Sequence, residues 1–188
     1  MKVIEIKSSA FPNYITGTFF IPNQPYIKVK YVGPEMIVSH STDTTIKYNT
    51  IVDGNSGEGV DGGVANPQLI TINPTAGYIR LGLAGRYLIT ANASLVLEEN
   101  TLPTPRMINI TAKLNNNVIL KQNLGWIGTV NNYIQGSVNI TDVIDIKETD
   151  LVTENRANLF FTVFSSWTGS AVQLKAGELT TASVYFLG

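Results

Sequence analysis

Few residues in this chain are of the types that perform chemistry. The only histidine, His40, stands between Ser39 and Ser41 in a stretch that we expect to be a strand, and the chain has no cysteine. A general base needs a side chain that titrates near its working pH, and a zinc site needs several histidine or thiolate ligands. A glycine-rich phosphate loop before a helix is also missing from the sequence. We therefore expect that the protein is not an enzyme and that it binds no metal or other cofactor.

One loop could surround a calcium ion. The segment Asp53–Asp61, DGNSGEGVD, is dense in glycine and carries oxygen ligands of the kind that calcium prefers. These ligands would be Asp53, Asn55, Glu58 and Asp61. Their spacing does not match the helix–loop–helix calcium pattern, so we favour a solvated loop without a metal.

Two tryptophans are candidates for contact with a ligand. Trp126 and Trp167 both fall in expected loops, the first after a glycine and the second after a serine. An exposed indole stacks on the face of a sugar or anchors a protein interface. The alternative is that each ring covers an open end of the fold. A host glycan therefore stays open as a ligand.

Charge and composition exclude two classes of partner. The chain of 188 residues has 13 Lys and Arg against 14 Asp and Glu, so no basic field is present to hold nucleic acid. No apolar run approaches the length of a membrane span, and residues 1–14 lack the apolar core of a signal peptide. We expect synthesis in a cytoplasm without export. Charged residues are only 14% of the chain, which favours association between copies.

The longest regular pattern is Gly85–Glu98, GRYLITANASLVLE. Apolar residues alternate with mixed ones along it, which is the period of a β-strand. The other segments that we expect to be strands are Met36–Ser41, Thr44–Ile51, Leu69–Asn73, Tyr78–Leu81, Arg106–Leu114, Val118–Gln122, Tyr133–Thr141, Ala157–Ser166 and Thr180–Leu187. No segment shows helical periodicity over a useful length. The sequence predicts an all-β fold, a ten-stranded antiparallel jelly-roll sandwich.

Residues 1–35 differ from the rest of the chain. Four prolines interrupt short alternating pieces there, and each proline breaks a hydrogen-bond ladder. We interpret this part as an extended N-terminal arm, followed by a jelly-roll domain at residues 36–188. The arm is too apolar for a disordered tail, and it either wraps its own domain or lies on a partner by strand addition. Its apolar residues include Ile4, Ile6, Phe19, Phe20, Ile27, Val29 and Tyr31.

Two late segments have apolar residues on both faces. Phe160 and Phe164 lie on the second face of one segment, and Tyr185 and Leu187 lie on the second face of the other. A strand on the inside of a sandwich needs only one apolar face. The second face must therefore be covered by another layer or another chain.

The order of several motifs over residues 36–188 resembles the head module shared by complement C1q and tumour necrosis factor. The version found in phage and bacterial surface proteins is the most similar. The motifs are TTIKYNTIVDG, ITINPTAGYIRLGLAGRYLITANASL, NNNVI, SVNITDVIDI and a final SVYFLG. The sequence departs from the pattern at Glu148–Asp150, where relatives often carry a Gly-Asp pair. This departure affects local strand boundaries rather than the fold.

The resemblance implies a ten-stranded jelly roll that assembles as a homotrimer around a threefold axis. The late segments with two apolar faces agree with such an assembly. The residues that we expect at the trimer interface are Phe160, Phe164, Tyr185 and Leu187, with Tyr133 and Tyr48 as further candidates. The alternative is that these side chains pack under the arm or a loop of the same chain.

An apolar arm joined to a trimeric jelly roll suggests a component of a virus particle. Our leading hypothesis is a phage capsid decoration or cement protein on the capsid surface, with the arm bound to the major capsid protein. The alternative is a receptor-binding head of a tail or head fibre, with loops that contact a host glycan. A secreted signalling ligand is disfavoured because we find no export signal.

Overall fold

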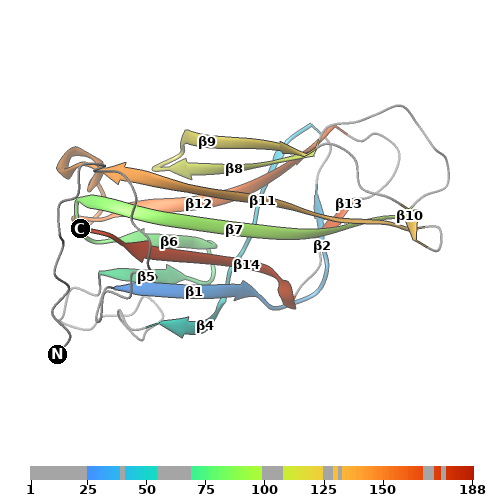
Figure 1. Ribbon diagram of the computed structural model, residues 1–188, viewed down its shortest axis with the longest axis horizontal. Coiled ribbons are helices and arrows are strands. Elements are labelled where there is room, and N and C mark those ends of the chain that lie inside the picture. The colour runs from blue at the N-terminus through green and yellow to red at the C-terminus, as the bar shows by residue number, and fades with distance from the viewer. Residues whose placement is uncertain are drawn as a thin grey trace, which may run out of the picture.

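Two antiparallel β-sheets pack face to face in the computed structural model (Figure 1). The structure describes residues 25–38, 41–54, 69–98, 108–124, 129–130, 133–166, 172–174 and 177–188. Over these ranges the one helical element is η1, a 3-10 turn at Glu148–Asp150. The predicted all-β class is therefore confirmed.

The first sheet has eight strands. They are β1 (Tyr26–Tyr31), β2 (Met36–Val38), β4 (Thr50–Gly54), β7 (Gly85–Glu98), β10 (Thr129–Val130), β11 (Tyr133–Ile146), β13 (Val172–Leu174) and β14 (Gly177–Phe186). Their order is β10-β11-β7-β14-β1-β4, and β13 pairs with the far end of β7 and with β2. In Figure 1 this sheet lies toward the viewer.

The second sheet has six strands. They are β3 (Asp43–Thr45), β5 (Ile70–Asn73), β6 (Tyr78–Leu81), β8 (Ile108–Leu114), β9 (Asn117–Leu124) and β12 (Ala157–Ser165). Their order is β5-β6-β12-β8-β9, and β3 pairs with β12. Apart from β2, β3, β10 and β13, which have two or three residues, ten described strands of four or more residues make up the two sheets. The predicted ten-stranded antiparallel jelly roll is confirmed.

The core lies between the sheets and follows the predicted alternation. On β7, Tyr87 and Ile89 are 0% exposed and Ala91 is 3% exposed, whereas Leu88 and Thr90 are only half-buried. On β12, Leu159 and Phe161 are both 0% exposed. Each large apolar side chain that is removed from water in this way stabilises the fold by about 1.5–3 kcal/mol.

The predicted arm ends earlier than residue 35. β1 pairs with β14 on one side and with β4 on the other, so it is an inner strand of the eight-stranded sheet. Ile27, Val29 and Tyr31 are 1%, 0% and 6% exposed in the core, so they cannot anchor a partner. The reason is that a short alternating segment becomes a core strand once two partners flank it. The domain therefore begins near residue 25. The remaining predicted anchors Ile4, Ile6, Phe19 and Phe20 lie outside the described residues.

The strand that we predicted at Tyr133–Thr141 continues beyond Thr141, as far as Ile146. β11 pairs with β7 without a register shift from Tyr133 to Ile146. Asp142 and Asp145 stand opposite Ile89 and Arg86 in this ladder. Asp142 and Asp145 interrupt the apolar pattern, so the sequence does not show that the strand continues to Ile146. Both acidic side chains are exposed, whereas Ile146 is 3% exposed.

Side chains and turns with positive φ end the strands. The β8–β9 hairpin turns at Asn115 and Asn116, with φ of 48° and 70°, because asparagine tolerates the left-handed backbone that a tight hairpin needs. After β1, the Asn49 side chain accepts a hydrogen bond from the Val32 N–H at 2.9 Å and donates one to the Val32 carbonyl at 2.6 Å. The side-chain amide of Asn49 thus provides the hydrogen bonds that a neighbouring strand would otherwise provide where β1 ends.

Candidate functional site

An apolar row crosses the outward face of the eight-stranded sheet. The registers of four adjacent strands place in one line Val143, Leu88, Tyr185 and Tyr26. The rings of Tyr26 and Tyr185 stack with centroids 5.5 Å apart and an interplanar angle of 10°. Val143 is 47% exposed, and Leu187 beyond β14 is 42% exposed. We call these five residues the apolar row. Apolar side chains gathered on an outward face are typical of an interface.

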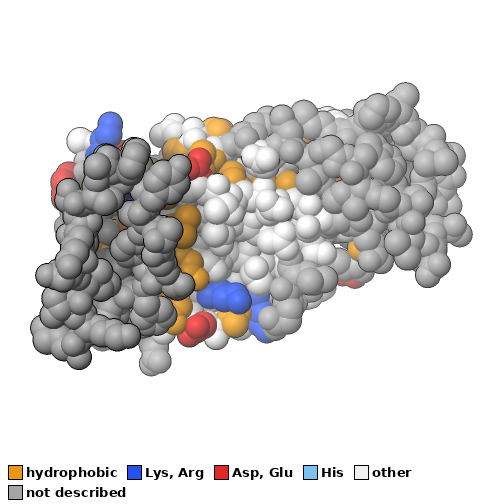
Figure 2. Space-filling model, in the orientation of Figure 1, with side chains coloured by type: hydrophobic (Ala, Val, Ile, Leu, Met, Phe, Trp, Pro, Cys, Tyr) orange, Lys and Arg blue, Asp and Glu red, His pale blue; other side chains and the backbone are white. Residues whose placement is uncertain are grey.

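Uncharged polar residues continue this face along the strands. One register line holds Thr141, Thr90 and Ser183 and continues to Lys28 on β1. The next line of the same face holds Asn139, Asn92 and Thr181 and continues to Lys30. Figure 2 looks onto this face and shows an orange band beside a broad white area, with charged side chains at its margin. Charged residues are depleted in the centres of protein interfaces because they are costly to remove from water. The face therefore suits contact with another protein surface.

The same sheet has an open edge along β11. On the side away from β7, described pairing is limited to β10, which stands opposite Tyr133 and Ile134. From Ser137 to Ile146 no described strand pairs with this edge. The segment contains no proline, lysine or bulge, and its charged side chains are the exposed Asp142 and Asp145. The Asp142 carboxylate accepts a hydrogen bond from the Val143 N–H at 2.7 Å. Apart from β10, no strand in the described part of the chain pairs with this edge.

The structure divides the residues that we expected at a trimer interface. Tyr185 and Leu187 lie on the outward face of the eight-stranded sheet. Phe160 and Phe164 lie on the outward face of the six-stranded sheet, because Phe161 between them fills the core at 0% exposure. The two pairs are separated by the thickness of the sandwich, so the prediction that all four share one surface needs correction.

Two further candidates for the interface have other positions. Tyr48 is 1% exposed and packs edge-on against Phe161, with ring centroids 6.0 Å apart. Its hydroxyl donates to the Thr181 carbonyl at 3.2 Å. Tyr48 therefore stabilises the core of its own chain and is withdrawn from the interface. The backbone of Tyr133 pairs with Glu98 in the first sheet, and its side chain is outside the described part.

The outward face of the six-stranded sheet is crossed by an ion pair. Lys113 on β8 stands opposite Phe160, and Asp43 on β3 stands opposite Phe164. The Lys113 Nζ and the Asp43 carboxylate meet across β12, where Thr162 is only 3% exposed. The pair thus joins three strands over the space between the two phenylalanines.

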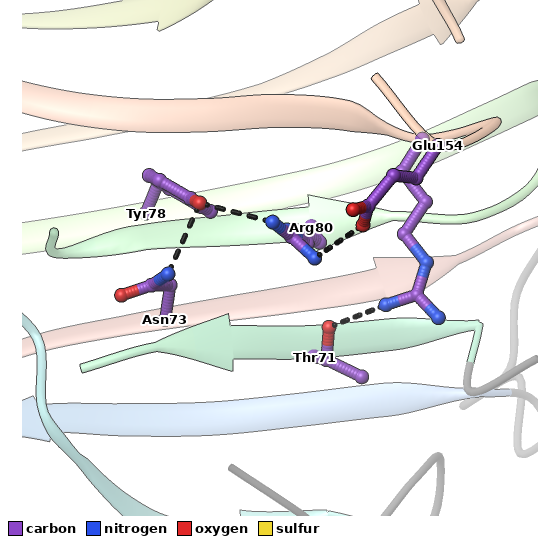
Figure 3. Close-up of polar contacts among 6 residues, drawn as sticks. Thr71, Asn73, Tyr78, Arg80 and Glu154 are labelled. Carbon is purple, nitrogen blue, oxygen red and sulfur yellow. Dashed lines mark hydrogen bonds and ion pairs between the residues drawn. The ribbon is translucent and has the colours of Figure 1, made fainter. Parts of the chain in front are cut away.

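A polar network continues this face toward the β5 edge (Figure 3). The Arg80 Nη1 lies 3.1 Å from the Glu154 carboxylate, and its Nη2 donates to the Tyr78 hydroxyl at 3.1 Å. The Asn73 Nδ2 donates to the same hydroxyl at 3.0 Å. The Tyr78 ring also packs edge-on against Phe160, with centroids 5.2 Å apart. Phe160 is therefore held by its own sheet.

A second arginine fastens the β11–β12 connection to the same edge. The Arg156 Nη1 donates to the Thr71 hydroxyl at 3.2 Å, and Thr71 is 1% exposed. Figure 3 shows Arg80 on β6 between Tyr78 and Glu154, with Thr71 on the neighbouring β5. The network contains one carboxylate, which is engaged by Arg80. It is an arrangement that cross-links the fold rather than one that transfers protons.

Two observations concern metal ligands and tyrosine environments among the described residues. No group of three or more His, Cys, Asp or Glu that could hold a metal ion is found in the described ranges. Burial raises the pKa of Tyr87 to about 12, and burial also raises the pKa of Tyr48. A hydrogen bond to Asp53 raises the pKa of Tyr26. These shifts move the hydroxyl groups further from neutral pH.

Several sequence candidates lie outside the described residues. They are His40, the loop tryptophans Trp126 and Trp167, and the calcium loop after Gly54. The glycan and calcium hypotheses therefore stay as predictions.

Three residues of the apolar row were missed by sequence reasoning. Leu88 fell on the mixed face of its strand, Tyr26 was assigned to the arm, and Val143 was assigned to a loop. The sequence does show an apolar residue on the otherwise polar face of these segments. This signal indicates an apolar row only once the strands are placed side by side.

The comparisons with known proteins support the fold. No protein-family model matches the chain, and no curated protein matches it. Among solved structures, the chain is similar to the Eiger TNF from S. frugiperda, with a TM-score of 0.55 and 14% sequence identity. The match covers 88% of this chain and 94% of that chain. The chain therefore has the jelly-roll fold of the C1q and TNF type. In the part of the chain that is described, no helix is long and apolar enough to cross a membrane.

Proposed function

We propose that this protein is a homotrimeric structural protein of a phage particle, a decoration or cement protein that stabilises the capsid. The observation that carries the proposal is the apolar row on the eight-stranded sheet, in which Val143 and Leu187 are 47% and 42% exposed. The Arg86–Asp145 ion pair borders the row on one side, and the uncharged Thr141, Thr90 and Ser183 border it on the other. An apolar centre with charged residues at its margin is typical of a protein interface.

The open edge of β11 supports a ring rather than a two-fold dimer. A heterologous contact joins two different surfaces, and it closes into a ring when the rotation between copies allows it. Each chain offers two such surfaces, the edge of β11 and the outward face that holds Tyr185. Three copies in a ring would bury both surfaces on every chain.

The attachment to a particle is supported by the N-terminal sequence and by the resemblance to phage surface modules. Residues 1–24 precede the described fold and include Ile4, Ile6, Phe19 and Phe20. In the proposal these side chains anchor the trimer on the major capsid protein. Three arms on one trimer multiply weak contacts through their effective concentration.

The first test is the mass of the purified protein by light scattering at low concentration. We expect a trimer. Val143→Arg places a charge on the proposed interface and should produce monomers that keep the thermal unfolding temperature of the jelly roll. Val152→Arg is the control, because Val152 is 65% exposed in the β11–β12 connection. A monomeric parent protein, or a trimeric Val143→Arg variant, would contradict the interface.

The second test is rebinding to capsids from which the protein has been stripped. We expect saturable binding in numbers that match the capsid symmetry, and loss of binding when residues 2–24 are deleted. The deletion must stop before Tyr26, because β1 is a core strand. A trimer that ignores capsids and binds host cells would instead assign the receptor-binding function.

A further inference from the structure

The hydrogen bonds of β7 show which backbone groups of β11 face the open edge. The Arg86 N–H donates to the Gly188 carbonyl at 2.8 Å, and the Ser94 N–H donates to the Thr180 hydroxyl at 3.1 Å. Thr180 lies in β14 and Gly188 follows it, so these residues of β7 donate away from β11. In an antiparallel pair, the two opposite residues either bond to each other or both point their backbone groups away. The partners of Arg86 and Ser94 on β11 therefore point toward the open edge.

Five residues of β11 present their N–H and C=O groups at this edge. The pairing of β11 with β7 has no register shift, so every second residue has the same direction. These residues are Ser137, Asn139, Thr141, Val143 and Asp145, and all five are exposed. No described strand pairs with them. A row of this kind pairs readily with the edge of another chain, and a second copy carries an identical row.

Asp142 stands at an inward position of this edge strand. Ile140 and Ile144, two residues away on either side, are 4% and 8% exposed in the core, whereas Asp142 is exposed. The Val143 N–H, which faces the edge, donates to the Asp142 carboxylate at 2.7 Å. The side chain of Asp142 therefore turns away from the core and covers a donor of the edge. A charged residue at an inward position is one of the devices that protect a sheet edge.

The pairing that Asp142 opposes can be written residue by residue. An antiparallel pair of β11 edges that uses all five residues has its two-fold axis at Thr141, so Thr141 stands opposite Thr141 of the second copy. Asp142 then stands opposite Ile140 of the second copy, on the inward side of a joined sheet. The carboxylate would have to release the Val143 N–H and lose water beside apolar side chains. Removal of an unpaired carboxylate from water is strongly unfavourable, so this pairing is disfavoured.

We propose that Asp142 prevents the edge of β11 from pairing with the same edge of a second copy. The inference deepens the proposed function, because it concerns the edge that the proposed ring buries. Two paired β11 edges would form a closed two-fold dimer and leave no edge for a ring of three. Asp142 thus selects between the two assemblies. Neighbouring copies in the ring then meet through side chains at this edge rather than through a continuous sheet.

The test uses a disulfide as the reporter of edge pairing in the full-length protein. The chain has no cysteine, so Thr141→Cys can form a disulfide only between two copies. In the pairing described above, the two Cα atoms at this position would be about 5.5 Å apart, which a disulfide spans. Thr141→Cys alone is compared with Thr141→Cys combined with Asp142→Val. The matched control combines Thr141→Cys with Asp145→Val, which removes a carboxylate from the same edge at an outward position, where it pairs with Arg86.

The proteins are refolded from urea under mild oxidation, so that every edge is free when copies meet. Disulfide-linked pairs are measured on a non-reducing gel. We expect Asp142→Val to raise their amount by about tenfold or more, because an apolar side chain there completes the inward row and frees the Val143 N–H. Asp145→Val should stay within about twofold of Thr141→Cys alone. Thermal unfolding checks that each variant is folded.

Three outcomes overturn the inference. One is an unchanged amount of linked pairs with Asp142→Val. Another is an equal rise with Asp145→Val, because the inward position would then be irrelevant. The third is abundant linked pairs with Thr141→Cys alone, because the edge would then pair despite Asp142. If Asp142→Val fails to fold, Asp142→Asn repeats the test with the charge removed and the shape kept, and linked pairs should again increase.

The inference and the proposed function fail in different measurements. Light scattering of the parent protein tests the trimer. A monomeric parent contradicts the trimer, and the disulfide comparison still measures edge pairing because the edge is then free throughout. A trimeric parent whose Asp142→Val variant forms no additional linked pairs leaves the proposed function in place and removes the role of Asp142.

Discussion

The two outward faces of the sandwich both carry aromatic and apolar residues, but the neighbours of these residues differ between the two faces. On the six-stranded sheet, Phe160 packs against Tyr78, and the ion pair of Lys113 with Asp43 crosses β12 beside it. On the eight-stranded sheet, Tyr185 stacks on Tyr26 and the apolar row continues to an exposed Val143. The first face is complete within one chain. The second face leaves apolar side chains exposed among the described residues, and in our proposal another chain covers them.

The difference shows that aromatic content alone does not identify an interface. What distinguishes the faces is where their charged side chains lie. On the first face the Lys113–Asp43 pair crosses β12 between Phe160 and Phe164, whereas on the second face the Arg86–Asp145 pair and Lys28 lie beside the apolar row and not across it.

The largest expected effect comes from a charge in the centre of each face. Leu88→Asp should weaken the trimer by about two orders of magnitude or more, because a buried unpaired carboxylate costs several kcal/mol. Phe160→Asp on the other face should leave the trimer intact and lower only the unfolding temperature. Sedimentation velocity across a dilution series measures both. Dissociation of the proposed trimer by Phe160→Asp would contradict the different roles that we assign to the two faces.

A neutral truncation gives a smaller effect. Phe160→Ala should destabilise the fold by about 1–3 kcal/mol, through the lost ring contact with Tyr78 and the lost burial. Urea unfolding at fixed protein concentration provides the value. The matched change Tyr185→Ala should make the unfolding midpoint depend more strongly on protein concentration, since it weakens association. Identical concentration dependence in the two variants would argue against distinct roles.

The ion pair on the six-stranded face should contribute little. The Lys113 and Asp43 side chains are 20% and 36% exposed, so solvent screens their attraction. We expect Lys113→Ala to cost about 1 kcal/mol or less, and less still in high salt. Unfolding in urea at two salt concentrations measures the cost. A large loss of trimer mass in this variant would show that the first face also takes part in assembly.

The smallest effect concerns proton binding by Tyr26. The hydrogen bond to Asp53 favours the neutral hydroxyl, so this group keeps its proton above the ordinary tyrosine pKa. A raised pKa in the folded state stabilises the fold below the ordinary value, and the contribution is lost as pH rises through the folded pKa. Asp53→Asn should move the Tyr26 titration toward lower pH in the ultraviolet absorbance of tyrosinate, with Tyr26→Phe to assign the signal. An unchanged titration would remove Asp53 as the cause.

Much of the fold could be predicted from local patterns. β6 was predicted with its observed bounds, Tyr78–Leu81, and β12 differs by one residue. The boundaries failed where local signals conflicted with pairing. Pro25 and Pro34 made β1 look like part of an arm, and Asp142 and Asp145 made the end of β11 look like a loop. In both places a neighbouring strand provides the backbone hydrogen bonds, and the local sequence gives no sign of that pairing.

The candidate site was predicted only in part. Tyr185 and Leu187 follow from the two apolar faces of their segment. Phe160 and Phe164 follow from the same rule, yet they lie on the other side of the molecule. The rule identifies a side chain that points away from the core. It contains no information about which other side chains lie next to it.

The sequence by itself determined which residues share a face of each strand, because side chains alternate with a period of two. It also determined the low charge, the single histidine and the absence of cysteine. Only the tertiary structure decided which faces of different strands come together. Strand pairing joins residues far apart in the chain, such as Tyr26 with Tyr185 and Leu88 with Val143. These pairings depend on the packing of the whole core, so the apolar row exists only once the sheets have formed.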